Sequence, residues 1–262
     1  VKARNETFKV PLTQQQARDA RDALAKEIYV RTFDYIVGKI NTATSSGDVD
    51  RAMRVVGLLD IFGFESFAVN RFEQLCINYT NEKLQQKFTL DLFKTVQQEY
   101  DEEGVPWTHV AFPDNAAVLT LIEGRMGIID VLNEECVRPR GSDEGFVSKL
   151  TTLHGTESTR YIPHKMNKDQ FTIKHYAGDV TYTAHHWLER NTDALPEDLA
   201  GVARSSSFAM LSQLFSSSVV TTKKKGKLVK DTVCTKFKAQ LTLLMEEIER
   251  TTVQYVRCVK PN

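Results

Sequence analysis

The sequence predicts a mixed α/β protein that is mostly helical, with an incomplete central sheet and a separate small β-hairpin. Three patterns support this fold class. Apolar residues recur at three- and four-residue steps over 14–41 and 70–103, which predicts two long helices. Apolar runs at 51–59 and 255–259 predict two strands of the sheet, and alternating β-formers at 161–183 predict the hairpin.

The composition is that of a globular protein with a sizeable core. The 262 residues are 41% hydrophobic and 26% charged, and 34 basic residues balance 34 acidic ones. A net charge of +0 gives no bulk affinity for nucleic acid, so charge matters only where it clusters. No apolar run reaches the length of a membrane span, and no stretch has the pattern of a signal peptide. We therefore expect no nucleic acid partner, no membrane contact within this segment and a cytoplasmic location.

Cysteine and histidine spacing argues against a disulfide framework and against a zinc site. The four cysteines are far apart and form no Cys-x-x-Cys pair, which favours a reducing compartment. His175, His185 and His186 suggest a metal site, but no further ligand follows at a suitable spacing. A role without a metal is the favoured interpretation of these histidines.

Start and stop signals set the expected bounds of the longest helix. Asn70 can cap it, with Glu73 three positions later as in a capping box. Gly104 and Pro106 end it near Glu103. At 1.5 Å per residue, such a helix spans about 45 Å.

The remaining elements follow from the same kinds of signal. Residues 1–13 are expected to be irregular, and Gly178 with Asp179 is expected to form the hairpin turn. A polar, lysine-rich stretch at 216–230 is expected to be a surface loop. Four further helical stretches are expected: 116–136, with a break at Gly124 or Gly127, 144–154, 197–215 and 233–250.

The most informative stretch is the acidic turn that follows the first predicted strand. The apolar run ends at Asp60, and Ile61, Phe62, Gly63 and Glu65 follow in a tight turn. An acid at the carboxyl end of a buried strand is how P-loop nucleotide hydrolases hold Mg²⁺. The same run is typical of an ordinary buried strand and its turn, so both interpretations stay open on these residues alone.

Residues 60–65 and 72–86 closely resemble switch II and the relay helix of the myosin motor head. The family pattern Phe-x-Ile-x-His-Tyr-Ala-Gly-x-Val-x-Tyr is matched at 171–182, and the resemblance continues over nearly the whole chain. It implies the fold of a P-loop NTPase-type myosin head. The chain, which starts at Val1, is then expected to be an internal fragment of an actin-activated ATPase motor. Phe62, where some classes have alanine, favours an unconventional myosin.

The resemblance implies a nucleotide site with ATP and Mg²⁺ as cofactors in the complete motor. Asp60 would hold the Mg²⁺ through water, and Ile61, Phe62 and Gly63 would complete the cofactor-binding turn. The Gly63 amide would bond to the γ-phosphate, which glycine permits by letting the backbone approach closely. Glu65 would pair with an arginine of switch I. The implied catalytic residues are therefore Asp60, Gly63 and Glu65.

The resemblance also implies three places of contact with actin filaments. The first is Glu6, a permanent charge sixteen positions before Asp22 that would need no kinase; a solvated loop acid is the alternative. The second is a helix-loop-helix that carries Met126, Ile128, Val137, Arg138, Pro139 and Arg140. The third is a loop whose contacts weaken with salt and which carries Lys223, Lys224, Lys225 and Lys227.

Details of the second contact differ from the family. This chain has Arg138 where an apolar residue is common, and Gly124-Arg125 where Lys-Pro is common. Ordinary packing is the alternative interpretation of Ile128.

Two motifs of a complete motor are missing from the sequence, the phosphate-binding Gly-x-x-x-x-Gly-Lys-[Ser/Thr] and the switch I Asn-x-x-Ser-Ser-Arg. We therefore expect this fragment neither to bind ATP tightly nor to hydrolyse it by itself. Light chains or calmodulin are expected to bind outside it. Two other functions stay open, a non-catalytic actin-binding module and a different P-loop-type switch ATPase.

The resemblance divides the chain into six parts. They are 1–50, the end of the upper actin-binding half; 51–66, a sheet strand and switch II; 67–108, the relay helix and relay loop; 109–215, the lower actin-binding half; 216–232, the lysine-rich loop; and 233–262, a helix and a central-sheet strand.

Overall fold

The computed structural model describes eight stretches of the chain: residues 2–3, 6–7, 11–45, 55–108, 110–112, 114–192, 195–216 and 232–256. The chain forms two compact units. The first comprises Val1–Leu58 and Asp193–Lys227, and the second comprises Leu59–Thr192 and Leu228–Asn262.

The first unit is built on a long helix, α1 (Gln14–Thr44), as its apolar periodicity predicts. Thr13 caps this helix, because its hydroxyl accepts from the Gln16 amide while the Gln16 side chain accepts from the Thr13 amide. Within the same unit, the Arg31 guanidinium lies over the Phe215 ring, 4.5 Å from its centroid. This contact joins α1 to α9 (Ala209–Ser216).

Two expectations for the first unit are wrong in detail. The stretch expected to be one helix at 197–215 is two, α8 (Glu197–Arg204) and α9, because the backbone turns at 205–208. The start of the chain, expected to be irregular, contains a short antiparallel pair, β1 (Lys2–Ala3) and β2 (Glu6–Thr7).

The two expected strands of a central sheet are absent from the described residues. Residues 55–59 run as irregular chain, and Val55 is 90% exposed. Tyr255 and Val256 are likewise outside any strand, and 51–54 and 257–259 lie outside the described residues. The physical reason is that a strand is held by hydrogen bonds to a neighbour, and no described segment pairs with these runs.

The second unit contains the predicted hairpin, extended by a third strand. The sheet is antiparallel in the order β3 (Tyr161–Pro163), β4 (Gln170–His175) and β5 (Gly178–Thr183). His175 faces Gly178 across the register, so the turn is Tyr176–Ala177 and not the expected Gly178–Asp179. Gly178 has a φ of +141°, a conformation that side-chain-bearing residues rarely adopt.

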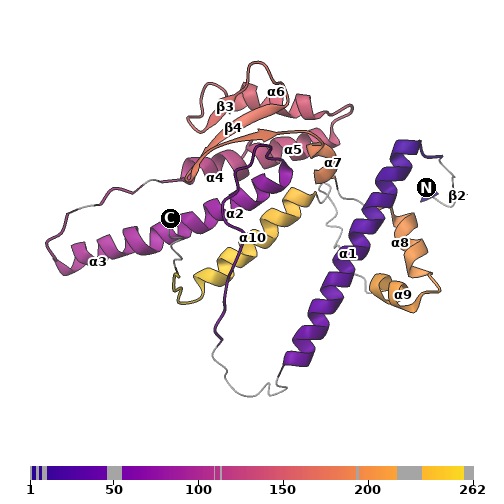
Figure 1. Ribbon diagram of the computed structural model, residues 1–262, viewed down its shortest axis with the longest axis horizontal. Coiled ribbons are helices and arrows are strands. Elements are labelled where there is room, and N and C mark those ends of the chain that lie inside the picture. Colours follow the sequence, from indigo (N-terminus) through magenta and orange to yellow (C-terminus); the bar gives the residue numbers. More distant parts are fainter. Residues whose placement is uncertain are drawn as a thin grey trace. The chain divides into compact units, whose positions relative to one another are not determined.

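Four helices pack with this sheet in the core of the second unit, to which two further helices also contribute Phe72, Leu75, Tyr79, Cys234 and Leu241 (Figure 1). The four are α4 (Ala116–Glu123), α5 (Ile128–Val137), α6 (Asp143–His154) and α7 (Trp187–Asn191). The predicted break between α4 and α5 is confirmed, because the chain bends at 124–127 and Met126 has a φ of +60°. Trp187 is fully buried at the centre of this core.

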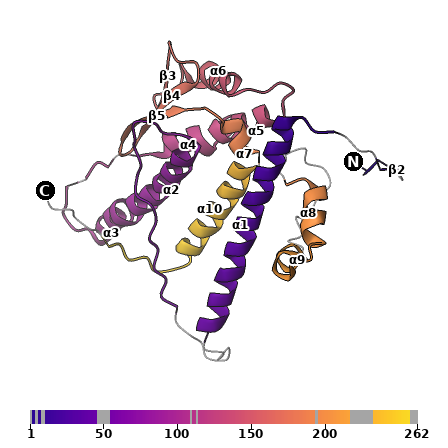
Figure 2. The same cartoon turned by 45° about the vertical axis from the view of Figure 1, so that its right-hand side comes forward.

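A long helical rod runs from Phe72 to Glu103 in the second unit (Figure 1). It consists of α2 (Phe72–Thr89), the π-helical segment η1 (Leu90–Thr95) and α3 (Val96–Glu103). The expected end is confirmed, since Gly104 closes the rod with a φ of +68°. The helix α10 (Val233–Glu249), predicted at 233–250, lies beside α2 (Figure 2).

The expected cap of the rod is wrong. Arg71, not Asn70, is the N-cap residue, and the Gln74 side chain accepts from the Arg71 amide at 2.9 Å. The side chain of Asn70 is used elsewhere, because its amide nitrogen donates to the carbonyl oxygen of Thr181 in β5 at 3.0 Å. The side-chain oxygen of Asn70, the atom that would cap a helix, accepts instead from the Phe67 amide at 2.7 Å.

Candidate functional site

The segment still called the acidic turn, residues 60–67, is irregular backbone and does not form the tight turn that the sequence predicted. It leads into the rod through residues 68–71. Asp60, Phe62 and Gly63 are exposed, whereas Ile61 and Glu65 are half-buried. The sequence-predicted nucleotide-site residues are neighbours in the chain and lie shortly before the start of α2.

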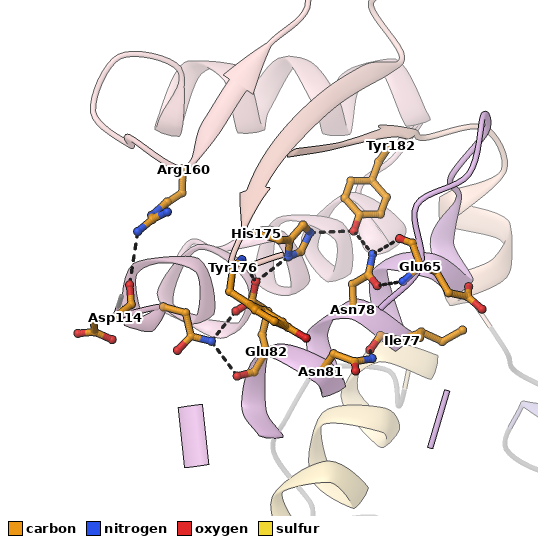
Figure 3. Close-up of polar contacts among 11 residues, drawn as sticks. Glu65, Ile77, Asn78, Asn81, Glu82, Asp114, Arg160, His175, Tyr176 and Tyr182 are labelled. Carbon is orange, nitrogen blue, oxygen red and sulfur yellow. Dashed lines mark hydrogen bonds and ion pairs between the residues drawn. The ribbon is translucent and has the colours of Figure 1, made fainter. Parts of the chain in front are cut away.

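Asn78 of α2 holds the backbone of the turn at Glu65 (Figure 3). Its side-chain oxygen accepts from the Glu65 amide at 2.8 Å, and its side-chain nitrogen donates to the Glu65 carbonyl at 2.8 Å. A single amide side chain thus satisfies both polar groups of one peptide residue. This arrangement fixes the turn on the helix without using the Glu65 carboxylate.

Two more asparagines hold the turn on either side of Glu65. Asn81 donates to the Phe62 carbonyl at 3.0 Å. Asn70 accepts from the Phe67 amide at 2.7 Å and donates to the Phe67 carbonyl at 2.9 Å. Two of these asparagines, Asn78 and Asn81, lie on α2, so the backbone of the turn is attached to that helix.

The chemistry of the turn fits a bound phosphate and cation. Among the described residues, no hydrogen bond or ion pair engages the Asp60 carboxylate, an oxygen ligand of the kind that Mg²⁺ prefers. A Cβ added at Gly63 would meet nothing within 4 Å, so the backbone there is open to a ligand. The Glu65 carboxylate accepts a hydrogen bond from Gln74 at 3.2 Å.

A buried polar network, formed by Asn78, Glu82, His175 and Tyr182, lies next to the turn (Figure 3). Nδ1 of His175 lies 2.9 Å from Oε1 of Glu82, and its Nε2 lies 2.8 Å from the Tyr182 hydroxyl. Sequence reasoning rejected a metal at His175 but missed its burial and these partners. The available signal was a histidine and a tyrosine on the same face of a predicted hairpin, an apolar face that otherwise needs no polar residue.

The helix-loop-helix predicted to bind a partner is only partly at the surface. Met126 and Val137 are exposed, as are Arg138, Pro139 and Arg140. Ile128 is 0% exposed and packs in the core, so the expectation that it belongs to an exposed patch is wrong. It is the second residue after the bend at Met126, where α5 begins and turns this side chain inward.

The other residues of the expected partner surface lie partly or wholly outside the described part of the chain. The backbone of Glu6 lies in β2, but its side chain is outside the described part of the chain. Lys223, Lys224, Lys225 and Lys227 also lie outside the described residues.

Comparison with known proteins decides the family. The family model of the myosin head (motor domain) matches residues 1–262. The chain belongs to the myosin head family. Human unconventional myosin-Vc is 41% identical over 274 residues, which cover 98% of this chain and 16% of that protein. Rat unconventional myosin-Va is 41% identical over 98% of this chain and 15% of the relative.

A plant relative matches this chain with a similar identity and coverage. Myosin-14 of Arabidopsis thaliana is 42% identical over 260 residues, which cover 99% of this chain and 17% of that protein. The chain thus spans about a sixth of the length of these myosins. Two of the three relatives are named unconventional myosins, which agrees with the interpretation of Phe62. Within the described residues, no helix is long and apolar enough to cross a bilayer.

Proposed function

We propose that this chain is part of a motor that binds actin filaments, hydrolyses ATP and moves along actin. The observation that carries the proposal is the acidic turn, whose backbone is fixed to the start of a long helical rod by Asn78 and Asn81. Membership of the myosin head family supports the same function. The motor would work in the cytoplasm, on the actin cytoskeleton.

In this proposal the acidic turn is switch II. Asp60 would hold Mg²⁺ through water, Ile61, Phe62 and Gly63 would lie beside the nucleotide, and the Gly63 amide would donate to the γ-phosphate. Glu65 closes the site against an arginine supplied from elsewhere in the motor. The bound nucleotide supplies the reactive phosphate, and these residues position it and stabilise its charge.

The rod α2–η1–α3 is the relay helix in this proposal. A movement of the turn on phosphate contact would shift the asparagines that hold it, and the rod would carry the shift along about 45 Å. Few flexible joints interrupt the rod, because its helical backbone continues through η1 to Glu103. The six-part division of the chain given above follows from the same assignment.

The actin contact lies on the exposed part of the α5–α6 connection. Val137 and Pro139 offer apolar area, and Arg138 and Arg140 add positive charge beside it. Glu6 and the four lysines at 223–227 complete the proposed surface. Ile128 supports this surface from the core. Light chains or calmodulin would bind outside this chain.

The test is co-sedimentation of the full-length protein with actin filaments, with and without MgATP. We expect binding at low salt that MgATP releases, together with actin-activated ATPase turnover. Filament binding that MgATP does not release would instead indicate a non-catalytic actin-binding module. Failure to bind filaments would contradict the proposal. The 262-residue chain alone is expected to show no turnover, since it lacks the phosphate-binding motif.

A further inference from the structure

The Tyr182 hydroxyl connects the hairpin to the residue that holds the acidic turn. It lies 2.9 Å from the side-chain nitrogen of Asn78 and 2.8 Å from Nε2 of His175. Asn78 has two N–H hydrogens, and the other one goes to the Glu65 carbonyl. Every polar atom of the Asn78 side chain is therefore used.

The hydrogen-bond directions in this network follow from the number of protons. Asn78 can only donate from its nitrogen, and the Glu82 carboxylate can only accept. In the neutral imidazole of His175, the N–H is therefore at Nδ1 and donates a hydrogen bond to Glu82, and Nε2 accepts the single O–H of Tyr182. Burial raises the pKa of Tyr182, which keeps the phenol protonated as this arrangement requires.

The far end of the network is a fully satisfied carboxylate. Oε1 of Glu82 also accepts from the Tyr176 amide at 3.0 Å, and Oε2 accepts from the Asn115 side chain at 2.5 Å. Glu82 is fully buried, so water cannot replace any lost partner. In the series Asn78, Tyr182, His175 and Glu82, each side chain thus donates a hydrogen bond to the next one. All of these hydrogen bonds point toward the Glu82 carboxylate.

We infer that Tyr182 is a positioning residue for the acidic turn: its hydroxyl orients the Asn78 amide, which holds the Glu65 backbone, and the His175–Glu82 pair orients the hydroxyl. The hairpin turn at Tyr176 and the start of α4 at Asn115 are connected to the same network. The turn therefore responds to the position of the hairpin as well as to α2. The effect of Tyr182 on ATP turnover rests on the proposed function, whereas the effect of Tyr182 on the Glu65 backbone does not.

A ring contact supports the same coupling independently of the hydrogen bonds. Phe64, the residue before Glu65, lies edge-on to His175 with ring centroids 5.3 Å apart. It meets Tyr176 in a similar geometry at 5.7 Å. The turn therefore touches the end of the hairpin through both its side chain and its backbone clamp.

The experiment is hydrogen exchange of the Glu65 amide in the full-length protein, followed by mass spectrometry of peptides that span 62–68. Tyr182→Phe keeps the ring but removes the hydroxyl. We expect exchange at Glu65 to be about tenfold faster, because the Asn78 clamp loses its orientation. Unchanged exchange at Glu65 in a folded variant would overturn the inference.

Tyr161→Phe is the matched control. Tyr161 is buried in β3 of the same sheet, and its hydroxyl pairs with Thr151 at 3.0 Å, away from Asn78. It should leave Glu65 exchange as in the wild type. Equal acceleration by both variants would mean a general loosening of the sheet, which also overturns the inference.

A second variant, Asn78→Ala, keeps the inference testable if Tyr182→Phe does not fold. Asn78→Ala removes the clamp itself and should accelerate exchange at Glu65 directly. In this background, Tyr182→Phe should add no further acceleration, because Tyr182 acts through Asn78. Additive effects of the two substitutions would contradict the inference.

Turnover separates this inference from the proposed function. If the wild-type protein is an ATPase, Tyr182→Phe should lower kcat severalfold and leave the KM for actin unchanged. If the wild type has no ATPase activity but Tyr182→Phe still loosens Glu65, the proposed function fails and the positioning role stands. If the wild type is an active ATPase but Tyr182→Phe leaves exchange at Glu65 unchanged, the positioning role of Tyr182 fails and the proposed function stands.

Discussion

Tyr255 donates a hydrogen bond from its hydroxyl to Oδ2 of Asp91 at 2.6 Å, across 164 positions of sequence. Asp91 lies in the π-helical segment of the rod and also pairs with Lys87 at 2.6 Å. The Tyr255 ring stands edge-on to Phe88, with centroids 4.9 Å apart. The segment after α10 is thus attached to the rod where its helical geometry changes.

Removing this hydroxyl should weaken the second unit. Tyr255→Phe is expected to lower the free energy of unfolding by about 1 kcal/mol, because one hydrogen bond to a charged group is lost. Urea denaturation measures this. Tyr100→Phe, in the same rod, is the control. Within the described part of the chain, the Tyr100 hydroxyl has no hydrogen bond. Equal losses in both variants would contradict the assigned role of Tyr255.

Stability should fall in alkaline solution. Burial is the main cause that raises the pKa of Tyr79, Tyr161, Tyr176 and Tyr182 above the ordinary value of 10.0. The folded state therefore holds these phenol protons more tightly than the unfolded state. Their contribution is complete below pH 10 and is lost as the pH rises through the folded-state values.

Alkaline unfolding can be followed by circular dichroism while absorbance reports tyrosinate. We expect a large part of the tyrosinate signal to appear together with unfolding. Ionisation of all tyrosines well before the loss of secondary structure would contradict the prediction.

A side chain at Gly127 should disrupt the bend between α4 and α5. A Cβ there would lie 2.7 Å from the Leu121 carbonyl oxygen and 2.9 Å from that of Gly124, and both are backbone atoms. Gly127→Ala is expected to destabilise the second unit by about 1–3 kcal/mol in thermal or urea unfolding. Gly63→Ala, where the added Cβ meets nothing within 4 Å, should stay within about 0.5 kcal/mol of the wild type.

The same Gly63→Ala variant should be impaired in catalysis. If the Gly63 amide contacts the γ-phosphate, a methyl group there obstructs the approach, and turnover of the full-length protein should fall by about two orders of magnitude. Gly57→Ala is the matched control, because that glycine is equally open but lies before the acidic turn. Wild-type ATPase rates in Gly63→Ala would exclude the proposed phosphate contact.

A charge on the proposed actin surface should weaken filament binding. Val137 is 52% exposed, so Val137→Glu is expected to leave stability unchanged and to raise the Kd for actin about tenfold. Val202→Glu, at a valine of α8 that is 66% exposed, is the control and should bind as the wild type does. Co-sedimentation at low salt gives both values. Equal affinities of the two variants would place the actin contact elsewhere.

The helices and the hairpin could be predicted because their signals are local. The rod ends at Gly104 as its sequence indicates, and the break between α4 and α5 occurs at the predicted glycines. Capping was predicted less well. Asparagine is a common N-cap residue, but the Asn70 side chain bonds to Phe67 and Thr181 instead. The contact with Thr181 depends on a strand more than a hundred residues away.

The sequence by itself determined the helical periods, the hairpin and the acidic residues of the turn, since each depends on neighbours a few positions away. Only the tertiary structure decided that Asn78 meets Tyr182 across 104 positions, and Glu82 meets His175 across 93. It also decided that 55–59 forms no strand, because a strand exists only where a second segment supplies the hydrogen bonds. Local patterns carry information on backbone conformation, whereas partners are chosen by the packing of the whole unit.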